Sequence, residues 1–249
     1  MAISSYTLKQ FARLRAYSLA GKHLAVPKLK MATLGYPDCL FSVEQADEAF
    51  WPGVCDDVPT RADSTAILAW HSLGKELGAI YETNAFMAAI GFDLTVFDVA
   101  EVRGGETLCD FNDKIPCQHH ATADVVYDGG SLEHLFNAPQ AISNMLALAK
   151  PGGYIFHHNP LNVLNHGFYN FNPTFYSDFY LDNGHELVGD IEAVKSSGLE
   201  YSVCTLPETD RFNAPAGDHW ISVKAKKKNE NAVAWPTQTK YKRNPSLVA

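Results

Sequence analysis

The sequence predicts an α/β fold with a mostly parallel sheet, and three observations within residues 123–160 support this prediction. A β-branched apolar run ends in Asp128-Gly129-Gly130, a segment with helical apolar spacing follows, and Pro151-Gly152-Gly153 precedes a second apolar run. This succession is typical of a strand, a helix and a second, parallel strand. Because ligands of such sheets bind at the carboxyl ends of the strands, we expect the chemistry in the loops that follow these two strands.

Composition points to one soluble domain. The chain has 249 residues, of which 46% are hydrophobic and 19% charged, enough to bury a single large core. We expect this domain to span residues 1–228, with an N-terminal helical cover, and a C-terminal arm to follow over residues 229–249. No apolar run approaches the roughly 18 to 20 residues of a membrane span, and the N-terminus lacks a long apolar segment, so we expect a cytoplasmic protein without a membrane partner.

Charge and cysteine content exclude further classes. The net charge of −8 gives no broad reason to bind nucleic acid, although the last 26 residues are locally basic. The five cysteines form no CxxC pair and are odd in number, which argues against a disulfide framework and against a zinc site. We therefore expect reduced thiols.

The first third of the chain supplies a covering helix and the first strand. The segment from Ser4 or Ser5 to Leu19 has helical spacing with Gly21 as a stop, and it should lie over the sheet or the ligand cleft. The strand Lys30–Leu34 follows and ends at Gly35. Residues 41–75 then predict two short helices around a Pro-, Asp- and Gly-rich excursion.

A further helix, Glu82–Ile90, leads into the strand Leu94–Asp98. Asp98 ends this strand where Rossmann-like folds place a carboxylate that accepts hydrogen bonds from ribose hydroxyls. Capping of the following loop explains the same residue without a ligand, and Glu101 is a nearby alternative for the ribose role. A short third strand is expected over residues 107–110.

The stretch Asp128-Gly-Gly-Ser-Leu-Glu133-His134-Leu135, followed one helix later by Leu148-Ala-Lys-Pro-Gly-Gly153, resembles the second half of a class I S-adenosylmethionine (SAM)-dependent methyltransferase. The resemblance is close over residues 94–173. It implies a Rossmann-like sheet that is mostly parallel with an antiparallel last strand, helices on both faces, and SAM as the cofactor.

The resemblance also assigns residues to the donor site. It implies that Asp110 hydrogen-bonds the adenine amino group, that Phe111 and Asn112 line the ring, and that Asp128 and Gly129 lie near the donor. An Asx-type turn before Pro116 accounts for residues 110–112 equally without a ligand. The family has a glycine-rich loop after its first strand, whereas this chain offers only Gly35 there.

Histidines near the strand ends are the catalytic candidates. His134 is the leading general base because its ordinary pKa lies near neutrality, with Asp128 and His158 expected around the same opening. Capping of the helix that begins about Asn137 is the structural alternative for His134. We predict no metal site, since no ligand spacing is diagnostic; the alternative is a divalent ion held by Asp128 and histidines such as His166.

The segment that follows Pro160 is rich in aromatic, His and Asn residues, and we expect it to shape an acceptor pocket. Phe175, Phe179 and Tyr180 stand at helical spacing after Pro173, so helix core is the alternative. Two alternating runs, residues 186–194 and 219–225, should supply the last, antiparallel strands. Trp235 in the arm could contact the body or a second subunit, which leaves a homodimer open.

These observations lead us to expect an enzyme: a SAM-dependent methyltransferase acting on a small-molecule acceptor, such as a sugar, a phenol or another small polar metabolite. The alternatives are a noncatalytic methyltransferase-like binding or scaffold protein and a nicotinamide-dependent oxidoreductase. The last is disfavoured because no G-x-G-x-x-G opens a strand-to-helix turn in the first half of the chain.

Overall fold

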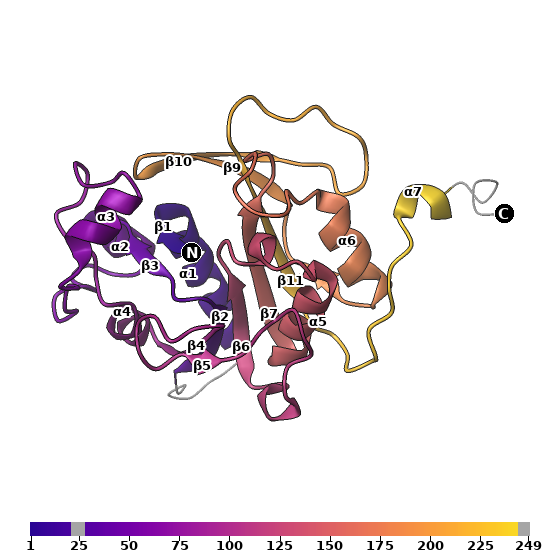
Figure 1. The fold of residues 1–249 in the computed structure, drawn as a ribbon, viewed down its shortest axis with the longest axis horizontal. Helices are drawn as coiled ribbons and strands as arrows, with labels where there is room; N and C mark the ends of the chain where they lie inside the picture. Colours follow the sequence, from indigo (N-terminus) through magenta and orange to yellow (C-terminus); the bar gives the residue numbers. More distant parts are fainter. Residues whose placement is uncertain (21–27, 244–249) are drawn as a thin grey trace.

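The computed structural model describes residues 1–20 and 28–243, and it is built around a mixed sheet of nine strands (Figure 1). Their order is β10-β9-β11-β7-β6-β2-β4-β5, and β8 pairs with β11. The strands are β2 (Leu29–Leu34), β4 (Phe92–Asp98), β5 (Thr107–Leu108), β6 (Ala123–Asp128), β7 (Ala149–Pro160), β8 (Glu186–Leu187), β9 (Glu192–Ser197), β10 (Glu200–Thr205) and β11 (Trp220–Lys226).

The direction of the strands confirms the fold class. Strands β5, β4, β2, β6 and β7 run parallel to their neighbours, whereas β11 lies antiparallel to β7 and to β9. Parallel neighbours bring their carboxyl ends to one edge of the sheet, so the residues that follow β2, β4 and β6 meet there.

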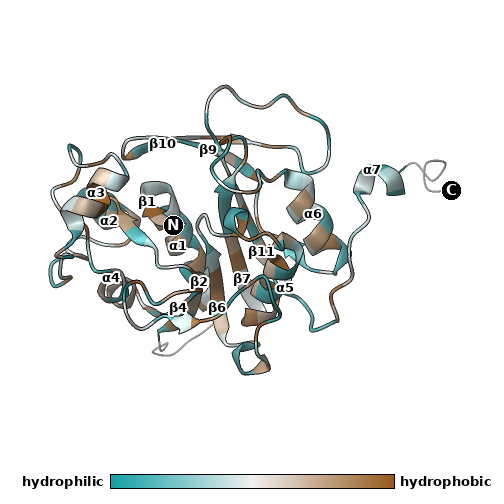
Figure 2. Ribbon diagram, in the orientation of Figure 1, coloured by the Kyte–Doolittle hydropathy of each residue, from teal (hydrophilic) through white to brown (hydrophobic). Residues whose placement is uncertain are grey.

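Helices pack on both faces of this sheet, as expected. They are α1 (Ser5–Leu19), α2 (Val43–Ala49), α3 (Ser64–Trp70), α4 (Thr83–Ala89), α5 (Ala138–Leu148), α6 (Pro173–Asp182) and α7 (Thr239–Lys242), with 3₁₀ turns at η1 (Cys117–His119) and η2 (Leu132–His134). One apolar cluster joins α1 and α4 to the sheet, and another joins α5 and α6 to its opposite face. Figure 2 shows the resulting hydrophobic colour along the central strands and the polar colour on the loops.

Local signals set the helix boundaries. The Ser4 side chain caps α1 by accepting from the Thr7 amide, which confirms the predicted start, and the Asn137 side chain caps α5. The expected stop at Gly21 lies outside the described residues. Among the residues the structure describes, no helix is both long and apolar enough to cross a membrane.

Four features were not expected from the sequence. A separate parallel pair joins β1 (Ala2–Ser4) to β3 (Asp38–Leu40), and β10 forms a hairpin with β9. Pro151-Gly152-Gly153 lies inside β7 instead of forming a turn, next to a register shift in β6. The third strand is shorter than expected, because Asp110 turns away from the sheet to bond Asn112.

Two segments extend from the sheet to distant helices. The tip of the β9-β10 hairpin reaches α1 and α2, where the Leu199 carbonyl accepts from the Ser5 hydroxyl at 2.7 Å and from the Gln45 amide at 2.9 Å. The arm runs along α6, and Asp178 accepts from the Thr239 amide at 3.0 Å.

Candidate functional site

The carboxyl ends of β4, β2 and β6 form the centre of the site. Leu34 pairs with Phe97 in the register, and Gly35 continues this contact because its amide donates to the Phe97 carbonyl at 2.7 Å. From β6, the Ser131 hydroxyl donates to the Leu34 carbonyl at 2.6 Å. The loops after three neighbouring strands are thus joined at one edge.

Gly35 lies between the two flanking loops. Its φ of +76° is in the left-handed region that favours glycine. A Cβ at this position would lie 3.3 Å from Ser131 Oγ and 3.7 Å from Asp98 Oδ2, and also 3.3 Å from the end of the Met1 side chain. A side chain here would therefore fill the space between Asp98 and Ser131.

The Asp98 carboxylate partly serves its own loop. Its Oδ1 accepts from the Val99 amide at 2.7 Å and from the Ala100 amide at 3.4 Å. This is the loop-capping role considered above. Its Oδ2 faces the Gly35 turn, so capping by one oxygen does not prevent a ligand from binding the other.

Residues 110–112 form the Asx-type turn that the sequence left as an alternative. Asp110 Oδ1 accepts from the Asn112 amide at 2.8 Å and from its side chain at 2.9 Å. Phe111 is buried against the edge of Phe97. Asn112 in turn accepts from the Asn137 amide at 2.9 Å, tying the turn to the start of α5. Adenine contact by these residues remains a prediction.

Asp128 is buried and anchors the loop after β6, and its predicted roles in donor contact and catalysis stay predictions. Its Oδ1 accepts from the Ser131 amide at 3.0 Å and the Leu132 amide at 3.1 Å. Its Oδ2 lies 3.1 Å from His157 Nδ1 and accepts from Asn159 at 2.8 Å. Burial alone would raise the pKa of Asp128, but the His157 contact and the amide donors outweigh it and lower the pKa.

The network continues from Asp128 into α6. His157 Nε2 lies 2.6 Å from the Tyr180 hydroxyl, and the Tyr176 hydroxyl donates to Asn159 Oδ1 at 2.6 Å. The sequence analysis missed both tyrosines as network members: the helical spacing of Tyr180 was that of ordinary helix core, and Tyr176 was not singled out. The alternative of helix core is confirmed for Phe179 and Tyr180, which are buried.

Glu133 is a second buried acid beside Asp128, and the sequence singled it out only as part of a motif. Its Oε2 accepts from Asn159 Nδ2 at 3.1 Å. Within residues 1–20 and 28–243, its buried Oε1 has no hydrogen-bond partner. Burial raises the pKa of Glu133 to about 8, and the negative charge of Asp128 acts in the same direction.

Two imidazoles lie at the opening beside Glu133. His134 Nε2 lies 3.8 Å and His166 Nε2 3.5 Å from Glu133 Oε1, and the two side chains are 50% and 38% exposed. Partial burial lowers the pKa of both histidines. Since Asn137 caps α5, His134 is free of the structural role that the sequence left open.

His158 lies on the side of β7 opposite His157, and its catalytic role stays a prediction. Neighbouring residues of β7 face opposite sides of the sheet, so His157 joins the Asp128 network while His158 stacks between Tyr6 and Trp220. The ring centroids are 5.5 Å and 5.6 Å away, respectively. Burial lowers the pKa of His158 to about 4, so this imidazole is neutral near pH 7.

Gly129 and Gly167 lie so close to neighbouring atoms that a side chain at either position would clash. A Cβ at Gly129 would lie 2.2 Å from the Tyr127 hydroxyl, and one at Gly167 would lie 2.7 Å from the Glu133 carbonyl. The Phe168 amide donates to that same carbonyl at 2.8 Å. The backbone after β7 therefore lies directly against Glu133, and this contact places His166 at the opening.

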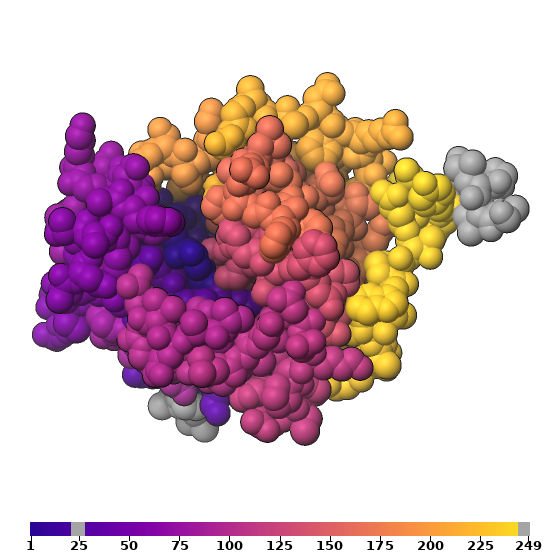
Figure 3. Space-filling view, viewed as in Figure 1, coloured from indigo at the N-terminus to yellow at the C-terminus, as the bar shows by residue number. Residues whose placement is uncertain are grey.

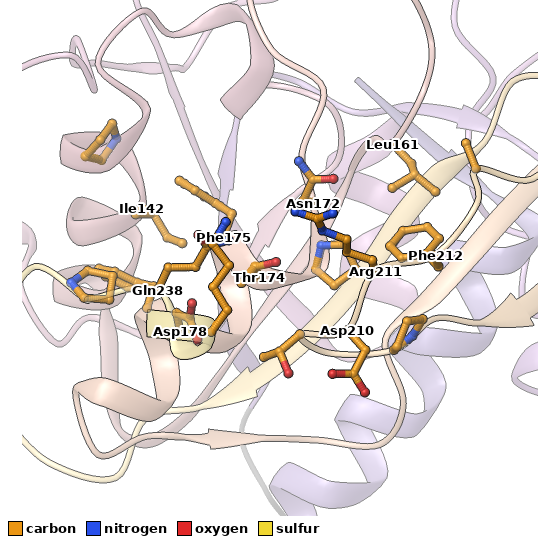
Figure 4. A pocket seen from close by; sticks show the side chains of 18 of the residues that line it. Ile142, Leu161, Asn172, Thr174, Phe175, Asp178, Asp210, Arg211, Phe212 and Gln238 are labelled. Carbon is orange, nitrogen blue, oxygen red and sulfur yellow. The ribbon is translucent and has the colours of Figure 1, made fainter. Parts of the chain in front are cut away.

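The space-filling view shows this face of the molecule hollowed, with N-terminal residues deep in the hollow (Figure 3). The hollow lies between the segment around α2 and α3 and the segments that follow β6 and β7. A separate cavity of about 720 Å³ lies between α5, α6, residues 207–214 and the arm (Figure 4). Phe175, Asp178 and Arg211 line this cavity, and none of the predicted donor or catalytic residues does.

Comparison with known proteins gives distant likenesses only. No family model and no curated protein matches the chain. A solved structure of the CurJ carbon methyltransferase is 12% identical with a TM-score of 0.46; the match covers 89% of this chain, which spans about half of that one, 54%. At such values a likeness assigns neither a family nor an activity.

Two further structures are similar to the same degree. A putative methyltransferase from Bacillus halodurans C-125 is 9% identical with a TM-score of 0.46, over 91% of this chain and 99% of that one. A Burkholderia thailandensis 1,6-didemethyltoxoflavin-N1-methyltransferase, solved with S-adenosylhomocysteine, is 16% identical with a TM-score of 0.41, over 68% and 78% of the two chains.

Proposed function

We propose that this protein is a SAM-dependent methyltransferase that acts on a small-molecule acceptor. One observation carries the proposal: Gly35, Asp98 and Ser131 meet at the carboxyl edge of three parallel strands, around a turn with a φ that favours glycine, where a Cβ would lie 3.3 Å from Ser131 Oγ and 3.7 Å from Asp98 Oδ2. A nucleoside bound across such strand ends can contact both the Asp98 carboxylate and the backbone of the Gly35 turn.

The residues present fit the donor. Asp98 Oδ2 would accept from the ribose hydroxyls, and residues 110–112 would lie along the adenine. The Gly35 turn, beside the Met1 side chain, would hold the methionine part. When bound, SAM supplies a methyl group activated by its sulfonium charge.

The chain's own contribution to the reaction is to position the acceptor and to receive its proton. His134 is half-exposed at the opening, and its lowered pKa keeps the ring neutral and able to accept a proton near pH 7. The buried network that starts at Asp128 positions Glu133 and the loop that carries His134.

Aromatic side chains around the opening support a small acceptor. Trp220 packs edge-on against His166 at 5.1 Å between ring centroids, and the exposed rings of Phe136 and Phe168 meet at 5.4 Å. Ring faces and imidazoles suit a sugar hydroxyl, a phenol or another compact polar acceptor.

Binding measurements test the proposal. Titration calorimetry should show binding of SAM and none of NADH. Asp98→Ala should weaken SAM binding by about tenfold or more, because it removes the side-chain oxygens that would accept hydrogen bonds from the ribose. Asp93→Ala, an exposed acid at the other end of β4, is the matched control and should bind SAM as the wild type does.

The outcomes separate the candidate functions. Binding of NADH without SAM would favour the oxidoreductase, and binding of neither would contradict the donor site. Equal SAM affinity in the wild type and in Asp98→Ala would remove Asp98 from the site. SAM binding without methyl transfer to any acceptor in a panel of sugars, phenols and amines would favour the noncatalytic alternative.

A further inference from the structure

The opening of the site gathers three side chains that are suited to a metal ion. Glu133, His134 and His166 each offer one ligand atom, and these atoms all lie within 4.8 Å of one another. In a tetrahedral zinc site with bonds of about 2.0–2.2 Å, neighbouring ligand atoms lie roughly 3.3–3.6 Å apart. The distances of 3.5 and 3.8 Å from Glu133 Oε1 to the two imidazoles approach this spacing.

Glu133 supplies an independent observation. Its side chain is fully buried, and within the described ranges Oε1 bonds no other group while it faces both imidazoles. A buried polar atom without a partner costs free energy, and a cation beside it would remove that cost. The Asn159 side-chain amide donates to Oε2 and leaves Oε1 without a hydrogen bond from the described residues.

The surroundings of Glu133 resemble the outer layer of a metal site. Ligating carboxylates are usually held by further hydrogen bonds. Here Asn159 donates to Glu133, and Tyr176 orients Asn159 from α6. Two exposed imidazoles complete the set, and their rings can rotate to close the remaining distance because neither is packed on all sides.

We propose that Glu133, His134 and His166 bind a divalent transition ion. Two imidazoles and one carboxylate favour Zn²⁺, Co²⁺ or Ni²⁺ over Mg²⁺ and Ca²⁺, which prefer sets of oxygens. Three protein ligands leave a fourth coordination position open to water or substrate, which is the arrangement of catalytic zinc sites. This inference does not depend on methyl transfer, but an ion and a proton compete for the same nitrogen of His134.

The test uses the untagged full chain, stripped with EDTA and transferred to metal-free buffer. Co²⁺ is titrated in and followed by its visible absorption, and Zn²⁺ is titrated by calorimetry. We expect one ion per chain. His134→Ala and His166→Ala should each weaken the affinity by about tenfold or more, and so should Glu133→Gln. His120→Ala, an exposed histidine in the loop after η1, is the matched control and should change nothing.

Both histidine variants alter partly exposed side chains, so their folding is checked by circular dichroism and should match the wild type. If the wild type binds no ion, the proposal is wrong. It is equally wrong if both histidine variants bind like the wild type, or if His120→Ala weakens binding as much as they do. SAM is titrated into the same EDTA-stripped protein. SAM binding without metal binding would contradict the metal site alone, and metal binding without SAM binding would contradict the donor site alone.

Discussion

At the scale of single residues, Asp128 and Glu133 differ although one Asn159 amide donates to both. Asp128 also accepts from two backbone amides and contacts His157, and its pKa is lowered. Glu133 lacks such support, and burial raises its pKa to about 8. The two carboxyl groups therefore make opposite contributions to the dependence of stability on pH.

Glu133→Gln tests this difference. Because the pKa of Glu133 is higher in the folded state than in the unfolded chain, the wild type loses stability as the pH rises from about 4.5 to about 8. Over this window, the unfolding free energy of the variant should rise relative to that of the wild type by up to about 1.4 kcal/mol for each pH unit. Denaturant unfolding of both proteins in EDTA at several pH values measures this difference in unfolding free energy.

Glu76→Gln, at an exposed glutamate, is the control and should follow the wild-type curve. A constant difference between Glu133→Gln and the wild type from pH 4.5 to 8 would show that Glu133 is not the buried acid described here.

Gly129→Ala should destabilise the fold. The new Cβ would lie 2.2 Å from the Tyr127 hydroxyl, which donates to the Ala2 carbonyl at 2.7 Å. Overpacking of this kind costs about 1–3 kcal/mol. Gly74→Ala is the control, because nothing lies within 4 Å of its Cβ position. The midpoints of urea unfolding measure both, and equal midpoints would contradict the packing.

At the scale of elements, α1 is tied to the sheet by Tyr6. The Tyr6 hydroxyl bonds Glu192 of β9 and Ser222 of β11, both at 2.5 Å, and its ring stacks on His158. Tyr6→Phe keeps the ring and removes these bonds, so it should cost about 1–2 kcal/mol because buried Ser222 and partly buried Glu192 lose a hydrogen-bond partner. Thermal unfolding measures the loss.

Tyr17→Phe changes a half-exposed hydroxyl on the same helix and should leave the melting temperature unchanged. If Tyr6→Phe has the same melting temperature as the wild type, the hydrogen bonds of the Tyr6 hydroxyl contribute no net stability.

The elements that could be predicted are those whose signals are local. The N-cap at Ser4 and the capping residue Asn137 mark two helix starts, and the β-branched runs of β4 and β6 place these strands. Strand β4 begins at Phe92, two residues before the expected Leu94. Strands β1 and β3 have three residues each and pair with each other from distant parts of the chain. Strand β10 instead pairs with its sequence neighbour β9 in a hairpin. Gly152 donates to the Lys227 carbonyl at 2.8 Å, a long-range bond that keeps a turn-like sequence in a strand.

At the scale of the whole molecule, the parallel order of β4, β2 and β6 brings the predicted donor residues to one edge, as the sequence pattern implied. What sequence reasoning could not supply is how each side chain is paired. Asp128 was predicted to contact the donor because it ends a strand. The sequence does not reveal that His157 and Asn159 of the neighbouring strand β7 contact its carboxylate. His166 reaches Glu133 only because β7 and its loop fold back on η2.

The most direct test of the donor site is a crystal structure of the protein with S-adenosylhomocysteine. Our account predicts the ribose at Asp98, the adenine beside residues 110–112, and the sulfur facing the opening where His134 and His166 lie. A nucleoside bound in the cavity beside α6, or a Gly35 turn left empty at saturating ligand, would contradict it.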